Sequence, residues 1–291
     1  MRLALIVTLL FPIFTLAKPL VLPEPKPDWN YVEQQLKASK FTKSFITEMK
    51  KNYDEDDFNE VLELNVLLFL RKADYHGPQI SGDSAEEVRD FIEKHRKTLD
   101  IAEQRYKVPA DVIVSLIWLE SRLGNNKGTF HVPSVYLHLL QANRKPVIDY
   151  LKTKTGRFAD KVTLKQMKSI PERAKRKSEW ALEELRAIAK IHKWHWEVGK
   201  DFTGSFAGAF GMPQFIPSSY VVWARPLEEG KQPILEKPED AIMSVAYYLK
   251  DHGWKTSVKK KRIEALMKYN NSRDYALAIL DLAKRTTEIS N

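Results

Sequence analysis

Cysteine is absent from the 291 residues of this chain, which excludes disulfide bonds and lipid attachment through an N-terminal cysteine. Alternating apolar and polar residues, the pattern of half-buried strands, are scarce. Internal repeats and low-complexity blocks are lacking. Beyond the first residues, no segment approaches the length of a membrane-spanning helix. These absences leave a mainly α-helical globular chain, organised as one large domain or two smaller ones.

The chain carries a net charge of +9, spread over its length except for one basic run, Lys259–Arg262. A positive net charge is typical of proteins that bind nucleic acid, anionic polymers or a membrane surface. Nucleic acid is the poorest of these candidates, because no zinc-finger or RNP-type motif occurs. The basic run itself is interpreted as a solvated helix face.

The N-terminus has the pattern of a secretory signal peptide. Met1-Arg2 supplies a short positive region, residues 3–16 are almost wholly apolar, and Ala17 offers a small residue at the cleavage position. The alternative is an uncleaved anchor. Residues 18–27 are rich in proline and predict an extended tether. The boundaries expected are therefore a signal peptide at 1–17, a tether at 18–27 and one domain at 28–291.

Helical spacing of apolar residues recurs along most of the remaining chain. Four helices are predicted from it: across 88–102, from about 179 to 196, from near Pro238 to Gly253, and from Ser272 through Tyr275 and Leu282. Proline favours a helix start, glycine a helix end, and serine an N-cap. The fold class expected is mainly α.

Glu120 ends a further predicted helix in an unusual setting. Residues 112–119 before it are apolar apart from one serine, which predicts a helix buried on most sides. Burial raises the pKa of a carboxyl and suits a general acid near neutral pH. Arg122 points away, and Gly124 is expected to end the helix and open space beside Glu120. The alternative is a helix-terminal glutamate that reaches solvent or pairs with a distant cation.

Residues 204–220, GSFAGAFGMPQFIPSSY, combine small residues, aromatics and the polar groups Ser205 and Gln214. Small residues allow backbone or substrate to approach closely, and interleaved aromatics build a wall. A tight loop packed under a core is the alternative. Together with Glu120, the segment favours a groove for a bulky neutral polymer.

Four motifs in order resemble the membrane-bound lytic murein transglycosylase B family: ESRLG at 120–124, GSFAGAFGMPQFIPSSY at 204–220, DAIMSVAYYLKDHGW at 240–254, and Tyr269-Asn270. The resemblance covers roughly residues 101–282. It implies a lysozyme-like helical catalytic domain, with additional N-terminal and inserted helices around a substrate groove. Members of that family cleave the glycan strands of peptidoglycan, so the same substrate is implied here.

By this resemblance, Glu120 is the single catalytic acid and base. The implied substrate-binding residues are Ser205, Gln214, Tyr248, Tyr269 and Asn270. The implied reaction cleaves the bond between N-acetylmuramic acid and N-acetylglucosamine and leaves a 1,6-anhydromuramoyl end. Two alternatives remain open: a lysozyme-type hydrolase that uses water, and a peptidoglycan-binding module without activity.

The sequence departs from the family pattern in several places. Trp118 stands one position away from the family's tryptophan, and Met212-Pro213 interrupts the family's Gly-Tyr-Gly before the glutamine. The segment of about 143–173 is basic and matches poorly. Between 224 and 239 there is no Asp-x-Asp-x-Asp-Gly ladder, so no calcium is expected. No other metal and no cofactor is expected either.

Other sites are disfavoured. His192 and His195 have a spacing that could seat a metal, but no third ligand supports it. Asp201 is interpreted as ending a helix or capping a turn. A Ser-His-Asp triad lacks a nucleophile elbow. The expected partner is peptidoglycan, with no nucleic acid and no stable membrane anchor after signal cleavage. A periplasmic or secreted monomer is expected.

Overall fold

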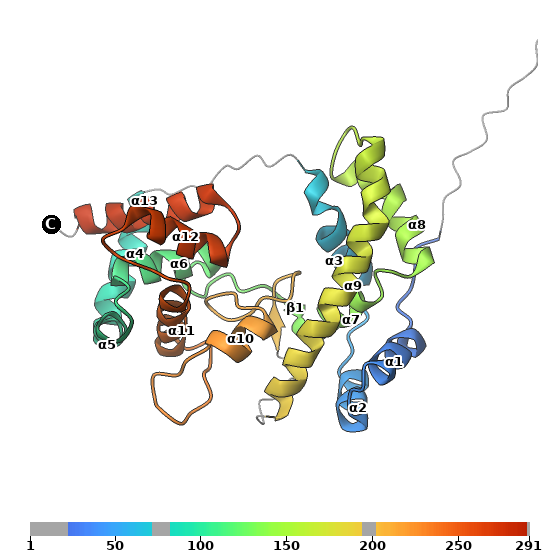
Figure 1. Ribbon diagram of the computed structural model, residues 1–291, viewed down its shortest axis with the longest axis horizontal. Helices are drawn as coiled ribbons and strands as arrows, with labels where there is room; N and C mark the ends of the chain where they lie inside the picture. The colour runs from blue at the N-terminus through green and yellow to red at the C-terminus, as the bar shows by residue number, and fades with distance from the viewer. Residues whose placement is uncertain (1–22, 72–81, 194–201, 290–291) are drawn as a thin grey trace, which may run out of the picture.

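The computed structural model describes residues 23–71, 82–193 and 202–289 (Figure 1). The predicted signal peptide and the start of the tether lie outside these residues, as do His195 and Asp201. Helices dominate the described part. Two short strands, β1 (Phe130–His131) and β2 (Thr203–Gly204), pair antiparallel with Phe130 opposite Gly204. The mainly α prediction is therefore confirmed.

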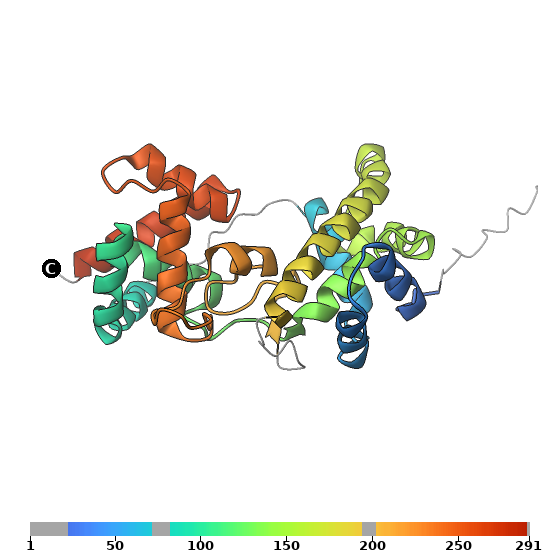
Figure 2. The same ribbon diagram turned by 60° about the horizontal axis from the view of Figure 1, so that its bottom comes forward.

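The helices gather into two lobes, as both ribbon views show (Figures 1 and 2). The first, which we call the Glu120 lobe, contains α4 (Gly82–Lys94), α5 (Arg96–Tyr106), α6 (Ala110–Ser121), α11 (Pro238–Asp251), α12 (Lys259–Tyr269) and α13 (Arg273–Ile289). The second, the α9 lobe, contains α1 (Trp29–Ala38), α2 (Lys43–Lys51), α3 (Phe58–Leu67), α7 (Val132–Leu140), α8 (Lys145–Thr153), α9 (Leu164–Lys193) and the 3₁₀ turns η1 (Leu68–Leu70) and η2 (Thr155–Arg157).

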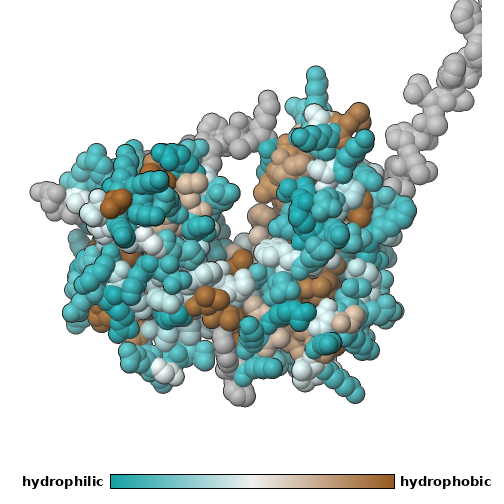
Figure 3. All heavy atoms as spheres, in the orientation of Figure 1, coloured by the Kyte–Doolittle hydropathy of each residue, from teal (hydrophilic) through white to brown (hydrophobic). Residues whose placement is uncertain are grey.

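Helix α10 (Pro217–Trp223) joins the lobes, because it packs against both α9 and α11. Above it, in the orientation of Figure 3, the surface is hollowed between the two lobes. Helix α6 runs toward this hollow with its C-terminal end, so the last turn of α6 is placed near the junction (Figures 1 and 2).

One connected apolar core runs through both lobes. Helix α6 is central to the Glu120 lobe, since its residues 112–118 are all buried and it packs against α4, α11 and α13. Helix α7 is buried along its whole length in the other lobe, between α3 and α9. Each buried Val, Leu or Ile side chain contributes about 1.5–3 kcal/mol, so these two helices anchor their lobes.

Two of the predicted helices are confirmed with their ends. Helix α11 has Pro238 at its first position, and Gly253 follows it with a positive φ of 81°. Helix α13 begins at Arg273, and the backbone N–H of Tyr275 donates to Ser272 Oγ over 3.2 Å. Proline, glycine and serine therefore have the roles that their local chemistry predicts.

The other two predictions were wrong in part. The helix expected across 88–102 is two helices, α4 and α5, that meet at His95. The break has a packing reason: α4 packs on α6 and α13, whereas α5 packs mainly on α11. The helix expected from about 179 is α9, which already begins at Leu164 and contains Pro171. Its start carries a capping box, in which Thr163 Oγ1 accepts from the Gln166 N–H and Gln166 Oε1 accepts from the Thr163 N–H.

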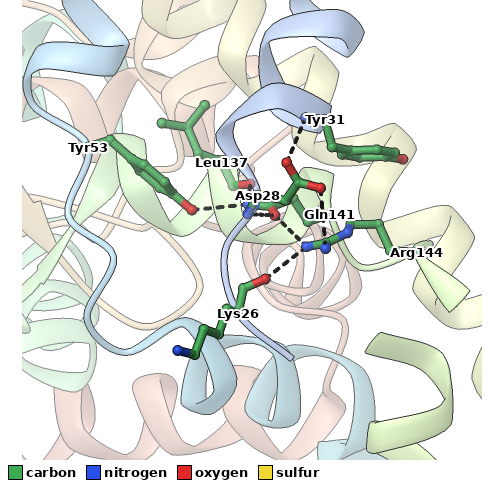
Figure 4. A network of polar contacts seen from close by, with 7 residues as sticks. All are labelled: Lys26, Asp28, Tyr31, Tyr53, Leu137, Gln141 and Arg144. Carbon is green, nitrogen blue, oxygen red and sulfur yellow. Dashed lines mark hydrogen bonds and ion pairs between the residues drawn. The ribbon is translucent and has the colours of Figure 1, made fainter. Parts of the chain in front are cut away.

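The last residues of the predicted tether are fastened to the α9 lobe (Figure 4). Arg144 donates to the Lys26 carbonyl over 3.0 Å and to Gln141 Oε1 over 2.9 Å. The Asp28 N–H donates to the same Gln141 oxygen over 2.8 Å, and Gln141 Nε2 donates to the Tyr53 hydroxyl. Because Gln141 is fully buried, this network fixes where the chain enters the fold.

Among the helices that the structure describes, none combines the length and the apolar character that crossing a membrane requires.

Candidate functional site

The end of α6 presents Glu120 at the edge of the core. Arg122 and Leu123 follow the helix with positive φ angles of 51° and 56°, and Gly124 continues with 93°. The helix thus ends at Ser121, earlier than Gly124, although Gly124 does take the left-handed conformation expected of glycine. Non-glycine residues in the left-handed conformation are strained and are common at functional sites. The turn after α6 therefore supports a functional role for the neighbouring Glu120.

Two side chains hold this strained turn. Ser121 Oγ donates to the Met212 carbonyl over 2.6 Å and accepts from the Gly124 N–H over 2.9 Å. The Arg122 guanidinium lies 3.5 Å from the ring centre of Trp118, whose indole N–H donates to Glu87. Arg122 therefore stacks on Trp118 and forms no ion pair with Glu120, as the sequence predicted.

The carboxyl of Glu120 is poorly solvated. Burial raises its pKa from 4.5 to about 7, and a hydrogen bond from Tyr275 works in the opposite direction. The Tyr275 hydroxyl, from the first turn of α13, donates to Oε1. No cation pairs with Glu120 in the part of the chain that the structure describes. The carboxyl is therefore poised to hold or release a proton near neutral pH.

The apolar spacing of the sequence places Tyr275 on the buried face of its helix and indicates no role for it at the site. It lies 155 positions from Glu120, beyond the motifs used for the resemblance. One signal was available: a tyrosine on a buried face needs a partner for its hydroxyl. The identity of that partner was not readable from the sequence.

The segment 204–216 is a compact loop that the α9 lobe holds in place. Gly208 packs on Tyr136, where a Cβ atom would overlap the ring, and its positive φ of 76° also favours glycine. The Tyr136 hydroxyl donates to the carbonyls of Ala207 and Gly208 over 3.2 and 3.1 Å. Asn65 donates to the Phe206 carbonyl over 2.8 Å. Glycine is thus used here for close approach, as the composition predicted.

Ser205 closes the first turn of this loop. Its N–H donates to the Ala209 carbonyl over 2.8 Å, and its Oγ accepts from the Ala209 N–H over 3.2 Å. Ser205 is partly exposed. No hydrogen bond joins it to Glu120 within the described residues.

Gln214 links the loop to the segment after α6. Its Nε2 donates to the carbonyls of Lys127 and Gly211 over 3.1 and 3.0 Å, and its φ is 52°. Gln214 follows Met212-Pro213, the place where the family pattern breaks. Those two residues are structurally engaged, because their carbonyls accept from Ser121 and from Tyr269.

Tyr269 lies close to Glu120, and Tyr248 packs against the ring of Tyr269. The pKa of Tyr269 is raised well above its usual value by burial, then by the charge of Glu120. Tyr248 is buried, donates to the Lys268 carbonyl over 2.8 Å and has a pKa raised to about 12 by burial. Their rings are 4.8 Å apart. Asn270 caps the end of α12 and is exposed. The tertiary structure thus groups Glu120, Tyr269 and Tyr275.

A second polar group lies on α9, in the other lobe. A pocket of about 210 Å³ is lined by Arg173, Arg176, Lys177 and Trp180, which we call the α9 basic cluster. The Lys177 ammonium lies 4.2 Å from the Trp180 ring and donates to Asn65 over 3.3 Å. Burial lowers the pKa of Lys177 to about 8. Asn65 also holds the 204–216 loop, so the cluster and the loop share a support.

Residues 23–71, 82–193 and 202–289 include no group of three or more His, Asp or Glu side chains suited to a metal ion. At the loop 224–237, which lacks an Asp-x-Asp-x-Asp-Gly ladder, the Asp240 carboxylate accepts from the N–H groups of Leu227 and Ile234 over 2.8 and 2.7 Å. A carboxylate thus braces this loop from within.

Comparison with known proteins identifies the family and the relatives that this chain resembles. The sequence profile of the transglycosylase SLT domain family matches residues 26–263. The membrane-bound lytic murein transglycosylase B of Escherichia coli strain K12 is 28% identical over 180 residues, which are 62% of this chain. The chain spans about two fifths of the length of that relative.

Solved structures share the fold. The soluble lytic transglycosylase SltB1 of Pseudomonas aeruginosa superimposes with a TM-score of 0.65 at 21% identity, over 90% of this chain and 98% of that one. SltB3 of the same organism, solved with NAG-NAM-pentapeptide, gives a TM-score of 0.63 at 21% identity, over 89% of this chain and 78% of that one. The lysozyme-like helical fold implied by the motifs is thereby confirmed, and the chain belongs to the transglycosylase SLT domain family.

Proposed function

We propose that this protein is a peptidoglycan lytic transglycosylase, with Glu120 as its only catalytic carboxylate. The observation that carries the proposal is the poorly solvated carboxyl at the end of α6, whose pKa is raised to about 7. Hydrolytic glycosidases that invert or retain configuration pair two carboxylates. Among the residues that the structure describes, no second carboxylate acts on the pKa of Glu120, which favours a reaction in which the substrate supplies the nucleophile.

In the first step, protonated Glu120 donates its proton to the oxygen between N-acetylmuramic acid and N-acetylglucosamine. The bond from that oxygen to C1 of the muramic sugar breaks, and the 2-acetamido group of that sugar stabilises the positive charge at C1. The hydrogen bond from Tyr275 to Oε1 stabilises the carboxylate that forms. Because this bond occupies one oxygen, the other is left for proton transfer.

In the second step, the Glu120 carboxylate accepts the proton of the C6 hydroxyl as that oxygen attacks C1. The product is a 1,6-anhydromuramoyl end, and no water is consumed. An oriented intramolecular nucleophile can reach effective molarities of about 10⁵ M or more, so an activated water is unnecessary. The same carboxyl thus acts first as acid and then as base.

The other predicted residues have supporting roles in this proposal. Ser205 and Gln214 orient the sugar from the loop 204–216, and Asn270 contacts it from the end of α12. Tyr269 lies beside Glu120, and Tyr248 supports Tyr269 through ring contact. Gln214 is already held by two backbone carbonyls, which fixes its amide before substrate binds.

The α9 basic cluster supports binding of the peptide stems, which carry carboxylates. Lys177 is partly desolvated and sits on an aromatic ring, so an anionic group gains more there than at an open surface. The complex of P. aeruginosa SltB3 with NAG-NAM-pentapeptide supports a substrate of this class.

We assign the catalytic domain to residues 28–291, after a signal peptide at 1–17 and a tether at 18–27, and propose action as a monomer in the periplasm or outside the cell. The domain extends past the family match at residue 263, because Tyr269 and Tyr275 border Glu120. The net charge of +9 supports adsorption to an anionic cell envelope.

The test is incubation of the mature chain with purified sacculi, followed by mass analysis of the released muropeptides. The expected products carry the anhydro ring. Products with a reducing end would identify a hydrolase that uses water. No released products from a folded chain would identify a binding module.

A further inference from the structure

A row of aromatic rings leads from the surroundings of Glu120 to the surface of α10. Tyr269 contacts Tyr248, and Tyr248 contacts Trp223 with ring centres 4.9 Å apart. His252 stacks on Tyr248 at 4.0 Å and lies 4.9 Å from Trp223. Trp223 and His252 form the outer end of the row, and neither has a role in the mechanism above.

Three fixed contacts hold this outer end. The indole N–H of Trp223 donates to Asp251 Oδ2 over 2.8 Å, and His252 Nδ1 donates to the Tyr248 carbonyl over 2.8 Å. The Trp223 ring meets Tyr248 edge to face, with an interplanar angle of 68°. The rings are therefore positioned before any ligand arrives, which lowers the entropy lost on binding.

The outer end of the row, at Trp223 and His252, exposes an apolar surface with a polar rim. Val222, beside Trp223, is 50% exposed, and both rings are only partly buried. Figure 3 shows a hydrophobic patch below the hollow, at the position of α10 in Figure 1. Asp251 is exposed at its edge. We call Val222, Trp223, Asp251 and His252 the Trp223 shelf.

A pyranose ring matches this combination. One face of the sugar presents C–H groups that pack on an aromatic plane, and its edge presents hydroxyls that donate to a carboxylate. Asp251 Oδ2 is engaged by the indole, and Oδ1 has no partner in the described residues. An exposed apolar patch rimmed by polar groups marks a binding surface more often than chance exposure does.

We propose that the Trp223 shelf is a further sugar subsite, which binds a pyranose ring of the glycan strand at a distance from Glu120. The proposal rests on the proposed function for the identity of the polymer. The ring contacts through Tyr248 connect the shelf to Tyr269 and place the shelf within a few sugar residues of that side chain.

The experiment uses the full mature chain with Glu120→Gln, so that no cleavage occurs, and β-1,4-linked N-acetylglucosamine dimers and hexamers as probes. Calorimetry measures the Kd, and NMR follows the indole N–H signal of Trp223, assigned by its loss in Trp223→Phe. Trp223→Ala in this background is expected to raise the hexamer Kd on the order of tenfold, the loss typical of a buried aromatic anchor. The dimer Kd is expected to change much less.

Matched variants separate the shelf from general effects. Tyr247→Ala removes an aromatic side chain from the neighbouring helix α11, on the side that packs against Tyr106 and Arg225, and is expected to leave hexamer binding unchanged. Val222→Glu alters an exposed residue, so folding is retained, and it should weaken hexamer binding by charge and bulk. It therefore tests the shelf even where Trp223→Ala lowers the melting temperature.

Unchanged hexamer affinity in folded Trp223→Ala, or in Val222→Glu, would overturn the shelf. An indole signal that stays fixed as the hexamer is added would do the same. The proposed function is judged separately by the products from sacculi. A chain that releases no anhydro products but binds the hexamer through Trp223 would overturn the lytic reaction and keep the shelf as a glycan-binding site.

Discussion

The two lobes place ionisable groups of opposite charge in similar surroundings. In the Glu120 lobe, burial raises the pKa of a carboxyl to about 7, and two tyrosines surround it. In the α9 lobe, burial lowers the pKa of the Lys177 ammonium to about 8, beside Trp180. Burial disfavours the charged form in both cases, so both groups move toward neutrality.

The two lobes are suited to different tasks, proton transfer in one and the binding of anionic groups in the other. A carboxyl that titrates near pH 7 and faces hydroxyl groups suits proton transfer. A partly desolvated ammonium with two arginines nearby suits the binding of anionic groups. We infer that the Glu120 lobe performs the chemistry and the α9 lobe holds the substrate.

The largest effect is expected from Glu120→Gln. The amide has nearly the same shape but cannot donate a proton as an acid, so the release of anhydro-muropeptides from sacculi should fall at least about 10³-fold. Circular dichroism should show an unchanged fold. Residual activity within tenfold of the wild type would mean that the acid is a different residue.

The same variant should change stability with a defined pH dependence. A carboxyl whose folded pKa is raised stabilises the fold below the unfolded pKa of 4.5, and that contribution is lost as the pH rises through about 7. Glu120→Gln should therefore be more stable than the wild type at pH 8, by about 3 kcal/mol, and similar to it at pH 4. Chemical unfolding at both pH values measures the difference. Equal stabilities at pH 8 would contradict the burial of this carboxyl.

Tyr275→Phe removes the hydrogen bond to Glu120 and keeps the ring. Because that bond lowers the pKa of Glu120, its loss should move the alkaline limb of the pH profile of kcat/KM to higher pH. The rate should also fall by about ten- to a hundredfold, the worth of a hydrogen bond to a charged group. Tyr220→Phe, at a buried tyrosine that donates to the Pro233 carbonyl, is the control. An unshifted limb would show that Tyr275 does not set the protonation of Glu120.

Lys177→Met tests the holding role of the α9 lobe. KM for glycan strands that carry peptide stems should rise roughly tenfold, because one charge-assisted contact is lost. Strands freed of their peptides should be cleaved as before. Lys175→Met, at an exposed residue on the same helix, is the control. A rise of KM that is equal for both substrates would show a structural effect instead of peptide recognition.

The smallest effect is expected from chelation. Asp240 already braces the loop 224–237 through two backbone N–H groups, so this loop should need no ion. Treatment with EDTA should change neither the melting temperature nor the release of muropeptides, and added calcium should not alter them. A calcium-dependent rise in the melting temperature would contradict the sequence-based expectation.

Local chemistry explains which features of the fold could be predicted. Proline, glycine and serine act on the backbone within one turn, so the ends of α11 and the start of α13 could be predicted from these residue types. The buried character of α6 followed from its continuous apolar run. The break at His95 was not readable, because α4 and α5 keep one apolar spacing while they pack against different partners. The early start of α9 was missed, although Thr163 and Gln166 form a capping box.

The sequence by itself determined the helical fold class and the apolar character of α6 before Glu120, since each depends on side chains near in the chain. Only the tertiary structure decided that Tyr275 donates to Glu120, that Ser121 ties α6 to Met212, and that Lys177 shares Asn65 with the loop. These contacts join residues 91 to 155 positions apart, so they depend on how the helices pack. Both levels act on the pKa of Glu120: burial at the end of an apolar helix raises it, and the hydrogen bond from the distant Tyr275 lowers it.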